Sequence, residues 1–187
     1  MSTPRPGSRA EQRQRTEARI LAAATQAFFG AGYDRTTIRA VAAAAGVDAG
    51  LVMHYFGSKQ ELYRRVIDAA PVPEISGAPG QAAEQILASL ADRLARADGA
   101  SLALLRSMLT NPEAASAASA GIARYEAQIA RAIPAPDADL RAAVISAITL
   151  GITVSRHLIK ADELATADPA RIIELLRPCL LALTIGG

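Results

Sequence analysis

The stretch GVDAGLVMHYFGSK, residues 46–59, decides the fold of this chain. It contains a short helix-forming run with a glycine in its interior, Gly50, where glycine costs about 1 kcal/mol relative to alanine. Aromatic residues make up only 4% of the chain, yet Tyr55 here stands beside a second aromatic residue. Asp48 is a good N-cap for the run. The pattern predicts a short helix over residues 48–56 whose surface has a task besides stability.

The residues before this helix fit a helix-turn-helix. A preceding helix is expected to start around the Thr36-Thr37 pair and to end at Ala44. Ala42 lets the two helices approach closely, and Gly46 supplies a turn residue with positive φ. An ordinary helical hairpin uses alanine and glycine in the same way, so the spacing alone leaves both interpretations open. The angle between the helices would be filled by Val41, Val47 and Val52.

Two capping boxes predict the helices on either side. Ser8 and Glu11 have the spacing of a capping box, so a long first helix is expected to begin near Ser8. Ser58 and Glu61 repeat that spacing and open a further helix after Phe56, which is expected to pack back into the core. The sequence therefore predicts a compact helical domain over residues 8–69 that contains the helix-turn-helix.

A segment rich in proline and glycine, residues 70–80, is the clearest boundary in the sequence. A second helical domain is expected beyond it, over residues 80–187. No alternating strand pattern is present, so we expect an all-α fold: an N-terminal three-helix helix-turn-helix domain followed by a C-terminal helical bundle. The bundle helices are expected at 80–97, 100–110, 112–133, 137–160 and 169–184, separated by turn and cap signals.

The charge distribution favours a polyanion partner for the first domain only. Residues 1–70 hold ten lysines and arginines against six acidic residues, whereas residues 71–187 hold ten against twelve. Chance asymmetry is the alternative explanation.

Cysteine content and hydropathy favour a cytoplasmic protein without a membrane partner. The single cysteine, Cys179, lies in an apolar helical pattern that predicts a core position, and it excludes a disulfide framework. The polar, basic start of the chain does not have the pattern of a secretory signal. The charge-free run between Arg141 and Arg156 has fourteen residues, whereas a membrane-spanning helix needs about 20.

Polar residues around residues 46–59 suit contacts with a DNA backbone. Thr37 offers a hydroxyl at a helix N-terminus, His54 a ring N–H and Tyr55 a phenolic donor. Lys59 adds a positive charge at a helix start, where free N–H groups already attract phosphate. The absent side chain of Gly50 would admit a base edge or a phosphate closely. We therefore interpret the stretch as a DNA-reading surface.

The segment TTIRAVAAAAGVDAGLVMHYFGSKQELYRRVID resembles the DNA-binding domain of the TetR family of transcriptional repressors, and the preceding ARILAAATQAFFGAGYDRTT is similar to that family's first helix. The resemblance covers about residues 15–68. It implies a homodimer that binds a palindromic double-stranded DNA operator and often a small-molecule effector. By position it assigns DNA contact to Thr37, Arg39, the 48–55 helix and Lys59.

This chain departs from the family pattern at two positions of the recognition helix. It carries Leu51 where members often have threonine or serine, and Met53 where they often have tyrosine. These side chains offer only apolar contacts, such as to a thymine methyl group. An operator sequence therefore cannot be inherited from relatives. Base specificity would rest on Arg39, Asp48, Ala49, Gly50, Leu51 and Met53.

The last two long helices carry the pattern expected of a dimer interface. Small residues recur every four positions at Ala143, Ala147, Gly151 and Ser155. A monomer could satisfy these stripes internally. The resemblance implies instead a homodimer formed through helices 137–160 and 169–184, as reading two half-sites requires.

By analogy with the family, the middle helices would surround an effector cavity. Tyr125 is the polar residue expected to contact an effector, because a buried phenol needs a partner. Each of these residues could equally belong to the core. The candidate ligand-binding residues are Leu90, Leu105, Met108, Tyr125 and Ile129.

Two rival functions remain to be weighed. An enzyme would need a nucleophile with a base, a paired carboxylate, a metal cluster or a phosphate loop. The sequence shows none of these, and His157 alone is no metal site, so we expect no catalysis, no metal and no cofactor. A helical ligand carrier or adaptor without specific DNA binding is the other rival, and it leaves Gly50, Tyr55 and the helix start at Lys59 without a purpose.

Overall fold

A computed structural model describes residues 9–70, 73–96 and 99–185, and within this part of the chain there is no strand. Of the residues that the structure describes, 82% are helical, which confirms the predicted all-α fold. The expected cap at Ser8 lies outside the described residues. The helices are α1 (Arg9–Ala31), α2 (Ile38–Ala45), α3 (Ala49–Phe56), α4 (Lys59–Ala69), α5 (Pro79–Ala95), α6 (Gly99–Thr110), α7 (Pro112–Arg131), α8 (Ala138–Val154), the π-helical segment η1 (Ser155–Ile159), α9 (Asp162–Thr166) and α10 (Pro169–Ile185).

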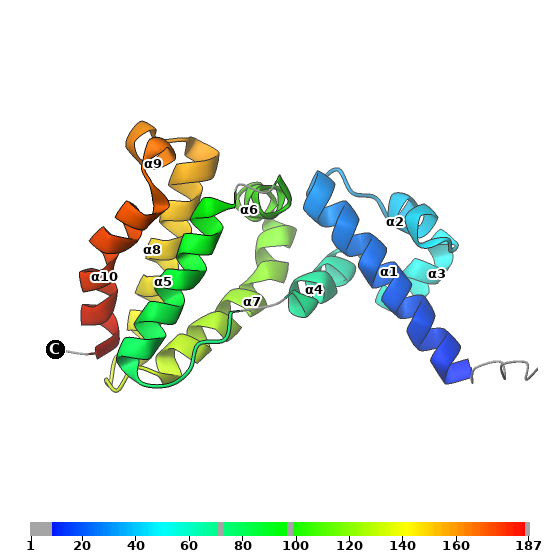
Figure 1. The fold of residues 1–187 in the computed structure, drawn as a ribbon. Coiled ribbons are helices and arrows are strands. Elements are labelled where there is room, and N and C mark those ends of the chain that lie inside the picture. The colour runs from blue at the N-terminus through cyan, green and yellow to red at the C-terminus, as the bar shows by residue number, and fades with distance from the viewer. Residues whose placement is uncertain (1–8, 71–72, 97–98, 186–187) are drawn as a thin grey trace, which may run out of the picture.

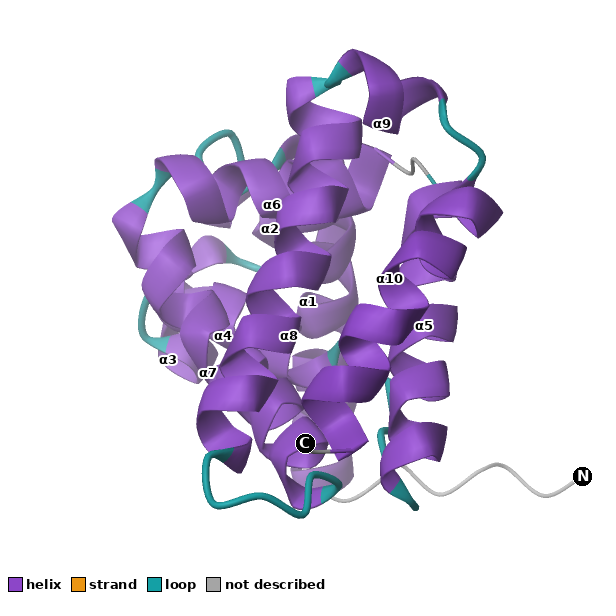
Figure 2. Cartoon of the chain, turned by 90° about the vertical axis from the view of Figure 1, so that its left-hand side faces the viewer, coloured by secondary structure: helices purple, strands orange, loops and turns teal. Residues whose placement is uncertain are grey.

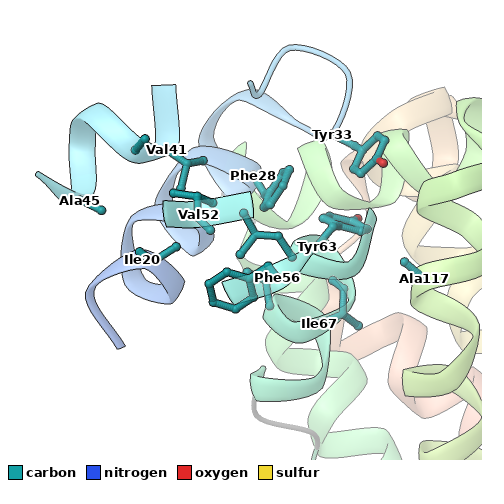
Figure 3. Packing of buried hydrophobic residues seen from close by; sticks show 14 of the residues in the cluster. Ile20, Phe28, Tyr33, Val41, Ala45, Val52, Phe56, Tyr63, Ile67 and Ala117 are labelled. Carbon is teal, nitrogen blue, oxygen red and sulfur yellow. The ribbon is translucent and has the colours of Figure 1, made fainter. Parts of the chain in front are cut away.

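The first four helices enclose one hydrophobic core, shown in Figure 3. Three aromatic rings lie at its centre. The ring of Tyr63 packs edge-on against Phe28 and against Tyr33, with centroid distances of 5.0 Å in both pairs. Phe56 is buried beside them, as predicted. Burying such rings contributes both apolar area and favourable edge-to-face geometry, so this cluster fixes how α1, α3 and α4 are oriented.

A second core lies among α5, α7, α8 and α10, at the left of Figure 1. Leu90, Ile129, Ile145 and Leu180 are each fully buried in it, one from each helix. The proline-rich boundary segment is tied to this core, because the backbone N–H of Ile75 donates a hydrogen bond to Gln128 Oε1 at 3.1 Å. The segment therefore belongs structurally to the second half of the chain.

The two halves are joined by α6 and α7, which lie between them in Figure 1. Ala114 and Ala117 of α7 belong to the first core. A side chain at Gly121 would meet the Cγ2 atom of Ile67 in α4 at 3.2 Å, so the small residue permits this close packing. The halves are thus in direct packing contact through α4 and α7.

The predicted 137–160 helix is confirmed as one continuous helical stretch, Ala138–Ile159, whose last turn is the π-helical η1. Two other expectations were wrong. The segment between the last two predicted helices was expected to form only turns, but it contains α9. Cys179 is exposed, because the turns of α10 that pack on α5 bury Ile172, Ile173 and Leu180 instead.

Helix α8 and η1 form one continuous stretch, Ala138–Ile159, of 22 residues. By length and composition alone this stretch could cross a membrane, with a mean hydropathy of 1.6 in its most apolar window and 22% of that window buried. This extent agrees with the predicted helix over residues 137–160, whose charge-free run has fourteen residues. A core helix of a globular protein meets the same test, so the length and composition do not decide between these uses.

Candidate nucleic-acid interface and ligand cavity

Local hydrogen bonds shape the turn between α2 and α3. Gly46 ends α2 with a φ of 63°, and its N–H bonds back to the α2 carbonyls. Asp48 then caps α3 by accepting a hydrogen bond from the N–H of Gly50 at 2.6 Å. A side chain at Gly50 would lie 3.0 Å from the same Asp48 oxygen. Gly50, which the sequence analysis assigned to close contact with DNA, is therefore also favoured by the structure, because a side chain at this position would crowd the Asp48 cap.

The predicted contact residues of α2 and α3 form an exposed surface at one end of the molecule. Thr37, Arg39, Asp48, Gly50, Met53 and His54 are exposed, while Ala49, Leu51 and Tyr55 are half-buried. Opposite them, Val52 and Phe56 are buried in the first core. The hydroxyl of Thr37 already accepts the N–H of Ala40 at 3.1 Å as the α2 cap. Such a surface can insert into a groove as one face of a helix.

Two arginines of α1, which the sequence interpretation did not single out, support this surface. The guanidinium of Arg13 lies over the Tyr55 ring, 5.7 Å from its centroid. Arg19 donates hydrogen bonds to the carbonyl oxygens of Ala45 and Gly46, the latter at 3.1 Å. Both contacts join residues far apart in the sequence, and no local signal reveals them.

Lys59 is held apart from the exposed α3 residues. Its ammonium lies over the ring of Tyr33, 4.3 Å from the centroid. Burial lowers the pKa of Lys59, and the nearby carboxylates of Asp34 and Glu113 oppose that change. The structure therefore places Lys59 at the joint between the two halves, and its predicted phosphate contact stays a prediction.

An apolar surface lies at the opposite end of the molecule, on α8 and α10. These two helices contact each other and face the viewer of Figure 2. Leu140 of α8 is 66% exposed and Leu175 of α10 is 63% exposed. Open space lies beside Gly151, where an added side chain would meet nothing within 4 Å. Exposed large apolar side chains of this kind mark interaction surfaces.

Three of the five candidate ligand-binding residues meet in one cavity. Leu105, Met108 and Tyr125 line a cavity of about 280 Å³ beneath α6, together with Ile67 of α4 and Ala70, which caps the end of that helix. The structure does not bring the other two candidates to it. Leu90 and Ile129 are instead fully buried in the second core.

Comparisons with known families match both halves of the chain. Residues 20–66 match the model described as "Bacterial regulatory proteins, tetR family". Residues 80–183 match the model described as "Tetracyclin repressor-like, C-terminal domain". The domain limits of 8–69 and 80–187 remain a prediction.

Two curated relatives share the first half. The transcriptional regulator TtgR and the probable transcriptional regulator ArpR, both of Pseudomonas putida, are each 39% identical over 59 residues. The match covers 32% of this chain and only 28% of each relative's length.

Solved structures share the whole fold at low identity. A TetR-family regulator from Streptomyces coelicolor is 24% identical with a TM-score of 0.51, and the match covers 95% of this chain and 99% of the regulator. NalD, the secondary repressor of the MexAB-OprM multidrug efflux pump in Pseudomonas aeruginosa, is 19% identical with a TM-score of 0.63, over 94% of this chain and 98% of NalD.

Proposed function

The chain belongs to the TetR family of bacterial regulatory proteins, and from that membership we propose that it is a cytoplasmic DNA-binding transcriptional repressor. It would bind a palindromic operator as a homodimer and release it when a small molecule binds. Both TtgR, a transcriptional regulator, and NalD, a repressor, support this proposal by their descriptions.

The exposed surface of α3 is the observation that carries the proposal. Gly50, Met53 and His54 share an exposed face, while Val52 and Phe56 anchor the helix from behind. A short helix with a firm core side and a free outer side suits the major groove of DNA, which admits one α-helix. The apolar side chain of Met53 would contact a thymine methyl group or a similar apolar base edge.

A homodimer would form through the apolar surface of α8 and α10. Pairing the exposed Leu140, Val144 and Leu175 with a second copy would remove apolar area from water, and the gap beside Gly151 would let the helices approach. Two-fold symmetry then presents two α3 helices to successive major grooves, about 34–36 Å apart.

The response to a ligand would pass through α4. The cavity that holds Leu105, Met108 and Tyr125 is also lined by Ile67 and Ala70, at the end of α4. A ligand that fits better when α4 is displaced would change the separation of the two recognition helices. The operator would then be released.

Selection of bound fragments from the source organism's genomic DNA tests this proposal. The purified protein should enrich duplexes with two inverted half-sites, with centres about 10–10.5 base pairs or a multiple of that spacing apart. Enrichment without any common sequence would contradict a repressor and would favour the helical carrier or adaptor.

A further inference from the structure

A second cavity lies beside the ligand cavity. A cavity of about 550 Å³ lies beside the one of about 280 Å³, and the two share part of their walls. The shared residues come from α5, α6, α8 and the boundary segment; they are Pro73, Arg93, Leu104, Leu105 and Leu150. We treat the two as one elongated site. The smaller cavity is called the inner chamber because the buried residues Ile67, Tyr125 and Thr149 line it, and the larger cavity is called the outer chamber.

The inner chamber is mostly apolar. Leu104, Met108 and Ile122 contribute to its wall. Among its polar residues, Thr149 already donates its hydroxyl to the Ser146 carbonyl at 3.1 Å. The chamber would therefore hold the apolar body of a ligand, since apolar surface gains free energy when it leaves water.

Tyr125 brings an unsatisfied hydroxyl to this chamber. The residue is only 8% exposed, and its hydroxyl has no hydrogen-bond partner among the described residues. A buried polar group without a partner costs about 1–3 kcal/mol. Burial raises the pKa of Tyr125, and the positive charge of Arg93 opposes part of that rise, so the two groups lie near each other. The phenol is thus an available donor beside a cation.

Arg93 lies where the chambers meet and has no carboxylate within ion-pair distance among the described residues. Its guanidinium donates a long hydrogen bond of 3.3 Å to the Ser89 carbonyl, one turn back on its own helix, and it also lies close enough to the Tyr125 hydroxyl to oppose the rise that burial causes in the pKa of that phenol. The other two charged residues of the outer chamber, Arg96 and Asp92, form an ion pair at 3.4 Å, and both are largely exposed. The net charge of the site is therefore positive.

The π-helical segment η1 completes the outer chamber. A ring nitrogen of His157 lies 3.2 Å from the carbonyl oxygen of Arg93. Arg156, beside it, donates to the carbonyl oxygens of Leu94 at 3.2 Å and Ala167 at 2.9 Å. The bonds to Arg93 and Leu94 fasten η1 to the end of α5, so the backbone of Arg93 is held in place. π-Helical turns are often found at functional sites.

We propose that the effector of this regulator is an amphipathic carboxylate. Its apolar body would fill the inner chamber, and its carboxylate would bind between the guanidinium of Arg93 and the hydroxyl of Tyr125. A guanidinium suits a carboxylate because it donates two parallel hydrogen bonds, and the phenol adds a third donor. This inference rests on the proposed function, since it names the ligand class of the same site.

Isothermal titration calorimetry with three probes of equal chain length tests the inference. The full-length protein is titrated with octanoate, octan-1-ol and octylamine. We expect octanoate to bind about tenfold or more tightly than the alcohol, because a hydrogen bond to a charged group is the stronger kind. Octylamine should bind most weakly. Equal binding of acid and alcohol, or no binding of octanoate, would overturn the inference.

Two variants and a matched control assign the effect to the named residues. Arg93→Gln and Tyr125→Phe should each weaken octanoate binding while leaving octan-1-ol binding within about twofold. Arg131→Gln removes the same charge from an exposed residue that lines neither chamber, and it should change nothing. Unchanged octanoate affinity in both variants would contradict the inference, and equal thermal unfolding of Tyr125→Phe and the wild type would show that the fold is intact.

The outcome separates this inference from the proposed function. Suppose that the protein binds DNA selectively, that octanoate does not alter this binding, and that octanoate and octan-1-ol bind equally well. This result would contradict the proposed carboxylate site but would still support the proposed repressor function. If octanoate binding depends on Arg93 but the protein shows no selective DNA binding, the proposed repressor function is contradicted and the proposed carboxylate site is supported.

Discussion

The phenolic hydroxyl of Tyr33 donates a 2.6 Å hydrogen bond to the carboxylate of Glu113, across 80 positions of the sequence. Tyr33 lies in the turn after α1, and Glu113 lies in the first turn of α7. The backbone N–H of Tyr33 also donates to Ser107 Oγ at 2.9 Å. The first half of the chain is therefore fastened to the second half at a buried aromatic ring.

Removing this hydrogen bond should destabilise the chain moderately. We expect Tyr33→Phe to lower the free energy of unfolding by about 1–2 kcal/mol, because the bond involves a charged acceptor that can regain water. Urea unfolding monitored by circular dichroism measures the change. In Glu113→Gln the same Tyr33→Phe change should cost less, and strictly additive effects would mean that the two residues do not interact.

Alkaline pH should unfold the protein through its buried tyrosines. Burial raises the pKa of Tyr63 from 10.0 to about 12, and burial and Glu113 raise the pKa of Tyr33 further. In this pH range the folded state keeps protons that the unfolded state has lost, so the free energy of unfolding falls as pH rises above about 10. Below that pH these two residues should cause no pH dependence.

Tyr63→Phe checks that assignment. The variant should show a shallower loss of stability between pH 10 and pH 12 than the wild type, measured by urea unfolding at a series of pH values. At neutral pH the variant should be at least as stable as the wild type, because the Tyr63 hydroxyl has no hydrogen-bond partner among the described residues. An identical alkaline slope in both proteins would refute the assignment.

A side chain at Gly46, in the turn between α2 and α3, should destabilise the protein. Gly46 has a φ of 63°, and an added Cβ atom would lie 3.2 Å from the guanidinium of Arg19. Gly46→Ala should therefore lower the free energy of unfolding by about 1 kcal/mol or more. Gly30→Ala is the matched control, since Gly30 is helical and has open space around it. That variant should gain up to about 1 kcal/mol, and equal effects of both would contradict the argument.

The proposed dimer depends on the exposed face of α8. Val144→Glu should yield monomers in sedimentation equilibrium, because a buried charge without a partner at an interface is strongly unfavourable. Leu109→Glu alters an exposed leucine of α6, outside the apolar surface of α8 and α10, and should remain dimeric. If the wild-type protein is monomeric at micromolar concentration, the proposed homodimer is contradicted.

Local signals predicted the helix-turn-helix closely. Gly46, Asp48 and Ser58 each terminate or cap a helix through bonds to residues within a few positions, so their roles follow from the neighbouring sequence. Val52 and Phe56 were also recognisable as core residues because they recur at helical spacing.

Contacts between distant segments could not be predicted in the same way. The position of Lys59 over the ring of Tyr33 depends on how the turn after α1 packs on α4. Cys179 shares a helical stripe with Leu180, but the twist of α10 against α5 exposes one and buries the other. Segment η1 depends on the bonds of Arg156 to α5 and to the turn after α9, which no local pattern encodes.

The most direct measurement is fluorescence anisotropy of the protein on a duplex selected from the source organism's genomic DNA, across a series of salt concentrations. We expect tight, sequence-selective binding that weakens steeply with salt. Arg39→Gln and Met53→Ala should lose about 1–3 kcal/mol of binding free energy, as for a lost base contact, whereas Arg106→Gln on α6 should bind as the wild type does. Weak binding that does not depend on the DNA sequence and is unchanged in Arg39→Gln and Met53→Ala would contradict the proposal that this protein is a repressor.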